Sequence, residues 1–328
     1  MERIAFILGD RFFYWSPILL TLAAAAAACA FLALYLGRSG NLTAAFAAVP
    51  LALGLSLAAA RMVHWYCRTQ SYDSLTAAMT DYSSGGYALV GAFAGCFLAA
   101  AFTRLVRLHR NLPEMLDCMS LAGAGGIALG RLASFFNSSD RGQLVETVRT
   151  MPWVYPVTNA VSGAQEYRLA TFLLQSMTAG VIFLVLLVFY LTGKRRRRDG
   201  DVTLIFLLCY CASQILLDST RYDSLYFRSN GFVSIVQVLS LGTVVLVAVV
   251  FSARLVRARG FRRWQLGLWG IMTALLGCVG YMEYHVQRHG NQALFSYSFM
   301  GVCLALVTTL ALVIRHMAQK PMGRYVKT

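Results

Sequence analysis

The sequence predicts an all-α fold, a polytopic bundle of about nine transmembrane helices, from its composition and from the spacing of its apolar segments. Of the 328 residues, 58% are hydrophobic and only 13% are charged, and the mean hydropathy is +0.60. A soluble domain carries roughly a quarter charged residues. Together with apolar blocks of about twenty residues, this composition excludes a soluble enzyme, a disordered protein and a secreted disulfide scaffold.

Nine apolar segments are the candidate spans. In chain order they cover residues 16–36, 44–60, 85–103, 114–136, 169–192, 202–218, 232–253, 264–282 and 295–314. Each is predicted to be a helix, because a helix satisfies its own backbone hydrogen bonds in lipid. The first two are rich in alanine and the third and fourth in glycine, which favours close helix packing or leaves room for a ligand.

The charge distribution predicts an N-out, C-in orientation. Alternate connections, from Arg38 to the C-terminal tail, hold 18 of the 29 basic residues but only four of the 14 acidic ones. This bias is typical of the cytoplasmic side of a membrane protein. The net charge of +15 is therefore assigned to an anionic membrane face, and a nucleic-acid partner is not expected. The N-terminal residues show no cleavable signal peptide.

The cysteines and acids suggest neither a metal nor another cofactor. Seven of the eight cysteines lie within spans, and Cys67 is expected in an outer loop without a disulfide partner there. Cys209 and Cys211 lack a histidine or acid at ligand spacing. The longest connection, residues 137–168, contains Pro152 and is predicted to lie outside, where long loops often cover sites.

Arg131 is the first candidate functional residue, because an ionisable side chain within a span is costly. It is placed about 9 Å below the outer end of the fourth helix, near Asn137. Gly130 and its glycine neighbours leave that helix face nearly bare, which would make room for an anion. The alternative is an arginine that extends to the interface.

Two more arginines are expected at the same depth. Asp218 and Arg221 are three residues apart, so a helix would place them on one face as an ion pair. Arg221 could still bind a phosphate through its guanidinium group. Arg61 ends the second predicted span beside His64, where an interfacial anchor is the simpler interpretation.

The chain resembles the prolipoprotein diacylglyceryl transferase family over about residues 4–256. Gly130-Arg131 and Phe135-Phe136-Asn137 are similar in register to that family's Gly-Arg-Ile-Gly-Asn-Phe-Ile-Asn stretch. Shorter similarities follow in the family's order: Ile4 to Gly9, Tyr14-Trp15, Ala60-Arg61-Met62, Ser84-Gly85-Gly86 through Gly91 and Gly95, Arg168 to Gly180, Asp218-x-x-Arg221, and Gln237-Val-Leu-Ser. The chain is thus divided into a transferase-like seven-helix domain, 1–256, and two additional helices with a basic tail, 257–328.

The resemblance also has clear departures. Val90 stands where the family has a histidine, and Ser134 where it has the first asparagine of the Gly-Arg motif. Ser16 and Ser139 replace a tyrosine and a glutamate of the family pattern. Arg131 and Arg221, which were singled out by the cost of burying a charge alone, are both retained from the family pattern.

The resemblance implies an enzyme of the bacterial inner membrane. It would move a diacylglyceryl group from phosphatidylglycerol to the lipobox cysteine of a prolipoprotein signal peptide, with Arg131 and Arg221 catalytic. The expected substrate contacts are Arg61, Gly86, Tyr87, Gly91, Gly130, Ser134, Asn137 and Asp218.

The base that takes the thiol proton is left open. Tyr87, His64 and Asp218 are the candidates, with Glu166 and Asp140 behind them. Alternatives to this enzyme are a degenerate relative that binds phospholipid or lipoprotein precursor without turnover, and a transferase with another acceptor. A transporter is disfavoured, since no span carries paired acids at mid-depth.

Overall fold

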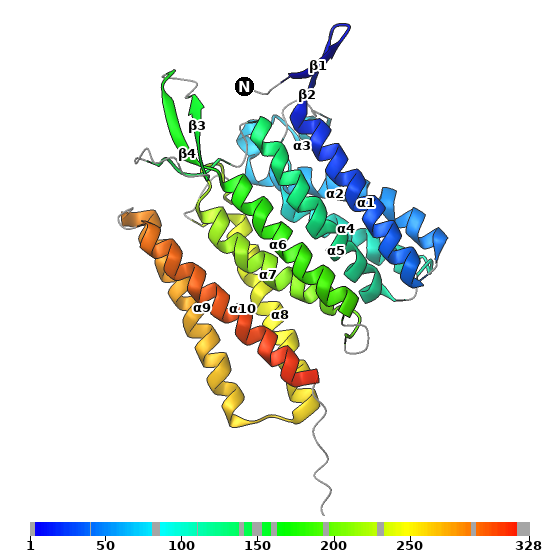
Figure 1. Cartoon of the computed structure of the whole chain (residues 1–328), viewed down its shortest axis with the longest axis vertical. Helices are drawn as coiled ribbons and strands as arrows, with labels where there is room; N and C mark the ends of the chain where they lie inside the picture. The colour runs from blue at the N-terminus through cyan, green and yellow to red at the C-terminus, as the bar shows by residue number, and fades with distance from the viewer. Residues whose placement is uncertain are drawn as a thin grey trace, which may run out of the picture. The chain divides into compact units, whose positions relative to one another are not determined.

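The computed structural model is a helical protein with two small β-hairpins (Figure 1). It describes residues 4–39, 41–80, 86–109, 111–137, 141–145, 153–158, 163–192, 197–227, 233–289 and 293–319. Gly85, Asp140 and Pro152, named in the sequence analysis, lie outside the described residues, as do Ser84, Ser139 and the end of the basic tail.

All nine predicted spans form helices, and most are longer than predicted. The helices are α1 (Trp15–Ser39), α2 (Leu42–Cys67), α3 (Leu75–Thr80), α4 (Leu89–Leu105), α5 (Leu112–Arg131), α6 (Thr171–Thr192), α7 (Asp201–Ser219), α8 (Ile235–Arg259), α9 (Arg263–His289) and α10 (Ala293–Gln319). Short 3-10 helices are η1 (Thr69–Ser71) and η2 (Leu132–Phe136). Within the described ranges, eight of these helices are long and apolar enough to cross a membrane, while α4 is apolar but shorter.

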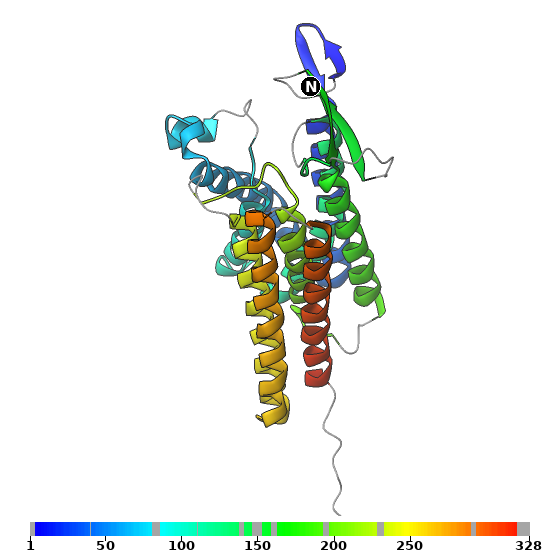
Figure 2. The same ribbon diagram turned by 90° about the vertical axis from the view of Figure 1, so that its left-hand side faces the viewer.

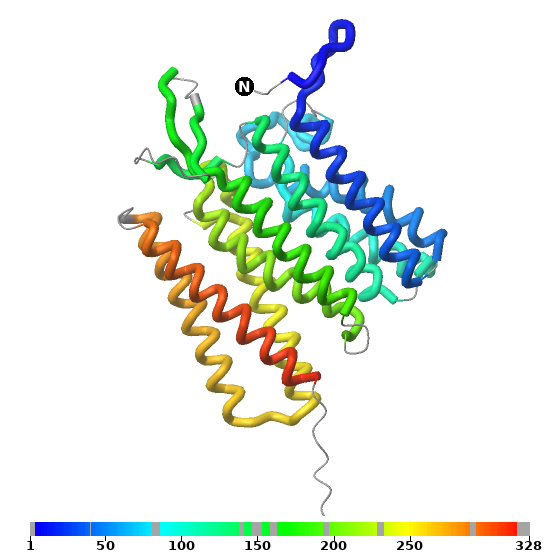
Figure 3. Tube along the Cα trace, viewed as in Figure 1, coloured from blue at the N-terminus to red at the C-terminus, as the bar shows by residue number. Residues whose placement is uncertain are grey.

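Two antiparallel hairpins flank these helices, and the sequence analysis did not predict them. The hairpin of β1 (Ile4–Leu8) and β2 (Arg11–Tyr14) runs directly into α1. The hairpin of β3 (Val154–Thr158) and β4 (Gln165–Leu169) pairs Val154 with Leu169 and precedes α6, as the trace in Figure 3 shows.

The chain forms two compact units. One contains the residues up to Phe206 together with Thr220–Val236, and the other contains Leu207–Ser219 and the residues from Gln237 onward. In the second unit α9 and α10 lie side by side as a helical hairpin (Figure 2). The division at residue 256 made from the sequence, like the N-out orientation, stays a prediction.

Glycines of α4 let it approach α2 closely. A Cβ on Gly95 would fall on the backbone of Ser56, and one on Gly91 on the backbone of Ala59 and Ala60. The Ser56 hydroxyl donates to the carbonyl of Ala92 at 3.0 Å. The space beside these two glycines of α4 is therefore filled by α2 and is not left for a ligand.

The second helix continues beyond its predicted end at residue 60. Arg61 is buried rather than interfacial, so the helix runs on to Cys67. Cys67, expected in an outer loop, is instead the last residue of α2 and is buried. The reason is that the arginine finds acceptors inside the protein, so its charge does not end the buried segment.

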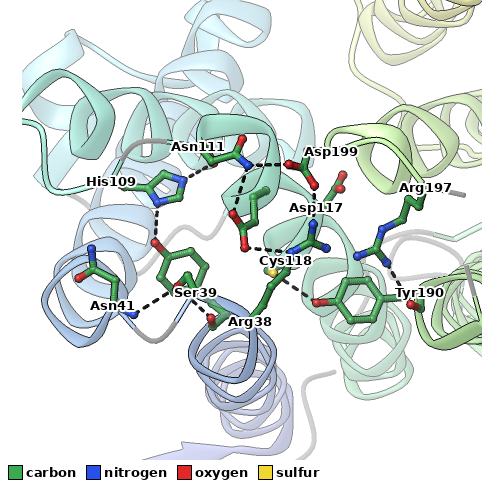
Figure 4. A network of polar contacts seen from close by, with 12 residues as sticks. Arg38, Ser39, Asn41, His109, Asn111, Asp117, Cys118, Tyr190, Arg197 and Asp199 are labelled. Carbon is green, nitrogen blue, oxygen red and sulfur yellow. Dashed lines mark hydrogen bonds and ion pairs between the residues drawn. The ribbon is translucent and has the colours of Figure 1, made fainter. Parts of the chain in front are cut away.

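A polar network closes one end of the first unit (Figure 4). Nε of Arg38 pairs with Glu114 at 2.9 Å, and Arg38 also binds Asp199. The side-chain amide of Asn111 donates to Asp199 at 2.6 Å. The network thus joins the end of α1, the start of α5 and the connection between α6 and α7, so three helix ends are fixed together.

Asp117 of α5 caps the first turn of α7. Its carboxylate accepts hydrogen bonds from the backbone N–H groups of Gly200 and Thr203, both at 2.9 Å, and from the Thr203 hydroxyl at 3.0 Å. Asp117 is fully buried. These N–H groups have no acceptor within their own helix, so the carboxylate fixes α7 against α5.

The glycine contact gives a first test. We expect Gly95→Ala to lower the free energy of unfolding by about 1–3 kcal/mol, because its Cβ would force α2 and α4 apart. Thermal unfolding in detergent measures this. Gly54→Ala is the control, since that helical glycine has open space around it, and it should be neutral or slightly stabilising. Equal effects of the two variants would contradict the close contact.

The capping carboxylate gives a second test. Asp117→Ala should lower the free energy of unfolding by about 2–4 kcal/mol, because buried N–H groups lose a charged acceptor. Asp117→Asn, which keeps one oxygen, should cost less. Thermal unfolding of both variants checks this order, and an alanine variant as stable as the parent protein would rule out the cap.

Candidate functional site

The sequence placed Arg131 inside the fourth helix, about 9 Å below its outer end, but it is the last residue of α5. The chain continues as the 3-10 helix η2, which forms the rest of the predicted span. The side-chain amide of Asn137 donates to the hydroxyl of Ser16 at 2.8 Å. The rings of Trp15 and Phe136 lie 6.0 Å apart. The start of α1 therefore holds the segment that follows Arg131, and Ser16 is one of its contacts.

Two glycines of α5 face α1, while Gly125 faces Phe183 of α6 and Gly123 has open space around it. A Cβ on Gly130 would meet side chains of Ala23 and Leu20 at 3.7 Å, and one on Gly126 would lie 2.8 Å from the Cβ of Ala27. The space that the sequence left for an anion beside Gly130 is thus filled by a neighbouring helix, since an alanine-rich helix fits against glycines.

Arg221 lies beyond the end of α7. That helix ends at Ser219, so the helical spacing used to pair Asp218 with Arg221 does not continue to Arg221. Nε and Nη2 of Arg221 each lie 3.0 Å from Oδ1 of Asp223. Asp218 itself is buried at the end of α7, and its predicted substrate contact stays a prediction.

A strip of main chain fixes the position of Arg221. Gly142 forms an antiparallel bridge with Arg221. The N–H of Gln143 donates to the carbonyl of Thr220 at 3.0 Å, and the N–H of Tyr222 donates to the carbonyl of Arg141 at 2.9 Å. Residues 141–143 therefore pair with residues 220–222 through backbone hydrogen bonds.

The other edge of this strip pairs with β4. The N–H of Gly142 donates to the carbonyl of Leu169 at 2.9 Å, and Leu144 bridges Arg168. A Cβ on Gly142 would lie 2.6 Å from that same carbonyl oxygen, so only glycine fits. Arg168 pairs with Glu166 at 2.8 Å and lies over the ring of Tyr222, 4.7 Å from its centroid.

The start of α6 links the Arg131 and Arg221 segments. The hydroxyls of Thr171 and Thr220 lie 3.2 Å apart, one residue before Arg221. The ring of Phe172 contacts that of Phe135 in η2 at 6.2 Å between centroids. Both predicted catalytic arginines are therefore held at the same end of the first unit, named here the arginine end.

Arg61 organises a second cluster, named here the α2 cluster, which consists of Arg61, His64, Tyr72, Gly86 and Tyr87. Nη1 of Arg61 donates to the carbonyl of Gly86 at 2.9 Å, and Nε to the carbonyl of Ala78 at 2.6 Å. The guanidinium lies over the rings of Tyr72 and Tyr87, 5.0 and 5.4 Å from their centroids. Arg61 is only 3% exposed, so it holds α3 and the residues before α4 onto α2.

A residue just after α2 contacts the loop that carries Arg221. Arg68, which follows α2, places Nη2 3.5 Å from the carbonyl oxygen of Asp223. Asp223 is the partner of Arg221. One residue of the same loop therefore contacts both the end of α2 and the predicted phosphate-binding arginine.

Of the predicted site residues, the structure brings several together. Arg61, Gly86 and Tyr87 form one cluster, while Ser134 and Asn137 lie in and after η2 beside Arg131. Gly91 and Gly130 serve helix contacts. The roles of all these residues toward a substrate stay predictions.

Sequence reasoning missed Tyr72, Asp223 and the backbone pairing of residues 141–145. Each lies in a connection, where neither hydropathy nor helical spacing gives a signal. The sequence offered two hints, the Arg141-Gly142 pair and the run Arg221-Tyr222-Asp223. In the described part of the chain no group of three or more metal-binding side chains is close enough to hold a metal ion.

The fold defines the class of the protein: a multi-pass helical membrane protein. Residues 4–253 match the sequence model of one family, prolipoprotein diacylglyceryl transferase. The match covers most of the chain, and the protein belongs to this family. Its helices α9 and α10 lie beyond the matched region.

Bacterial relatives agree with this assignment. The chain is 24% identical over 262 residues to a protein of Finegoldia magna named phosphatidylglycerol–prolipoprotein diacylglyceryl transferase. The aligned region covers 79% of this chain and 99% of the relative. Relatives of the same name from Synechococcus elongatus and Streptococcus agalactiae are 29% and 24% identical. They align with 61% and 60% of this chain and with 69% and 76% of their own lengths.

Arg61 gives a test of the α2 cluster. We expect Arg61→Lys to lower the free energy of unfolding by about 1–3 kcal/mol, because lysine cannot donate to both carbonyls in the same fixed geometry. Thermal unfolding in detergent measures the loss. Arg104→Lys, at an exposed position near the end of α4, should leave stability unchanged. A stable Arg61→Lys variant would show that the guanidinium is not the element that holds this cluster.

Proposed function

We propose that this protein is a membrane transferase that moves the diacylglyceryl group of phosphatidylglycerol to the lipobox cysteine of prolipoproteins. The main support is the family match over residues 4–253. It is joined by the arrangement at the arginine end, where the segments of Arg131 and Arg221 both meet the start of α6.

The chemistry explains why arginines are needed. Transfer of the diacylglyceryl group to sulfur forms a C–S bond and breaks the C–O bond to the phosphate. Glycerol phosphate leaves with one more negative charge than the phosphodiester carried. Fixed cations that face this phosphate stabilise the charge that develops in the transition state, and the guanidinium group suits phosphate geometry.

Arg221 is held ready for this role. Its Nε and Nη2 both contact the carboxylate of Asp223. The pair with Asp223 and the backbone bridge to Gly142 fix the side chain in one place. Such a fixed donor needs little reorganisation when charge develops on the leaving group, which is where its contribution would arise.

The donor lipid would reach this end of the protein from the bilayer. Large apolar side chains of α6 are exposed along its length, among them Met177, Val181, Leu184, Val188 and Leu191. A helix with such a face lies against lipid. The start of the same helix carries Thr171 and Phe172, so a phospholipid along α6 would place its headgroup near the arginine end.

Substitution of the two arginines tests this function. We expect Arg131→Ala and Arg221→Ala each to lower the transfer rate about a hundredfold or more, because each removes a charge that faces the leaving phosphate. The assay uses purified protein in phosphatidylglycerol liposomes with a synthetic lipobox peptide, and mass spectrometry detects the thioether product. Complementation of a transferase-depleted bacterium is the cellular measurement.

Arg104→Ala is the matched control, since that arginine is exposed at the other end of α4. It should retain full activity. Phosphatidylglycerol that copurifies with the parent protein and is lost in Arg131→Ala, with no thioether formed in either assay, would contradict an enzyme and favour the degenerate binder. Full activity in both arginine variants would contradict the proposed site.

A further inference from the structure

The transfer requires a group that removes the proton of the acceptor thiol, because the thiolate is the nucleophile. Val90 occupies the sequence position of the family histidine and cannot accept a proton. We propose that His64 of α2 takes this proton through Nε2, and that Tyr72 positions its ring. This inference rests on the proposed function.

The imidazole of His64 lies directly against the segment that leads to Val90. A Cβ on Gly86 would fall 2.7 Å from Nδ1 and 2.8 Å from Nε2 of His64. Gly86 also has a φ of +84°, which a residue with a side chain rarely adopts. A histidine from α2 thus lies beside the segment from which the family histidine would come, and Gly86 makes the space for it.

Tyr72 holds the ring in place through Nδ1. The phenolic oxygen lies 3.2 Å from Nδ1, and the two rings meet edge to face at 6.0 Å between centroids. In the tautomer in which Nδ1 donates to Tyr72, Nε2 carries the lone pair. Within the described part of the chain, Nε2 makes no hydrogen bond. This is the arrangement of an oriented base.

The surroundings of His64 are cationic. Arg61 lies one turn before it on α2, and Arg68 one turn after. Arg68 contacts the carbonyl of Asp223, whose carboxylate binds Arg221. Nearby arginines stabilise a thiolate, and the contact through Asp223 places the histidine and the predicted phosphate-binding arginine at the same end of the unit.

The proposed step moves one proton and exchanges a C–O bond for a C–S bond. The thiol proton passes to Nε2 of His64, and the sulfur attacks the glyceryl carbon that is bonded to the phosphate oxygen. The C–S bond forms while the C–O bond breaks, and its electron pair leaves with glycerol phosphate. The imidazolium then returns its proton to the departing phosphate or to water.

His64→Gln and His64→Ala test the assignment in the liposome assay with a lipobox peptide. Both should lower kcat/KM about a hundredfold at pH 7, within the range for loss of a general base. At about pH 9.5 a free thiol is already ionised, so the loss should shrink to less than tenfold. Arg131→Ala should show no such recovery. Tyr72→Phe should lose about tenfold or less, because it removes only the orienting contact.

His109→Gln is the matched control. His109 also binds a tyrosine, with Nδ1 2.6 Å from the hydroxyl of Tyr35, but it lies in the network at the opposite end of the unit. It should transfer at the parent rate. If the parent protein makes no thioether, the proposed function itself fails. If the parent and His109→Gln are active and His64→Gln is equally active, or remains impaired at high pH, the assignment of His64 as the base is wrong.

Discussion

The cost of placing a charge in a membrane governs this structure. An arginine within a bilayer must find acceptors in the protein or lie at a helix end, and three arginines of the first unit illustrate this. Arg61 is buried and donates to two carbonyls. Arg131 closes α5, and Arg38 closes α1 in the network of Figure 4. Arg38 and Arg61 fix helices through these contacts, and Arg131 is proposed to bind phosphate.

The sequence was sufficient to predict the helices, because the length and the apolar composition of a segment indicate a membrane-spanning helix. Each predicted span is a helix, but Arg131 ends α5 and does not lie about 9 Å inside it, because η2 forms the rest of that span. Helix ends were less well predicted, as in α2, where a buried arginine does not terminate the helix. The reason is that Arg61 depends on the carbonyl of Gly86, 25 residues away, and no local pattern reports such an acceptor.

The small residues show the same limit. Glycine on α4 and α5 predicted either close packing or an open cavity, and the two are indistinguishable in a single chain. Ser56 and Ala59 opposite Gly95 and Gly91 decide for packing. Gly86 is the exception, since it accommodates the His64 ring. The backbone contacts around Arg221 were equally beyond prediction, because they come from strand pairing between residues 141–143 and 220–222, which brings together segments far apart in the sequence.

That strip of backbone pairing has a practical consequence. Gln143 and Leu144 bind their neighbours through main-chain groups, and the Leu144 side chain is 53% exposed. A nitroxide or fluorescent reporter attached there would travel with Arg221 while leaving every hydrogen bond of the strip intact. Motions of the loop that carries Arg221 could thus be followed in real time.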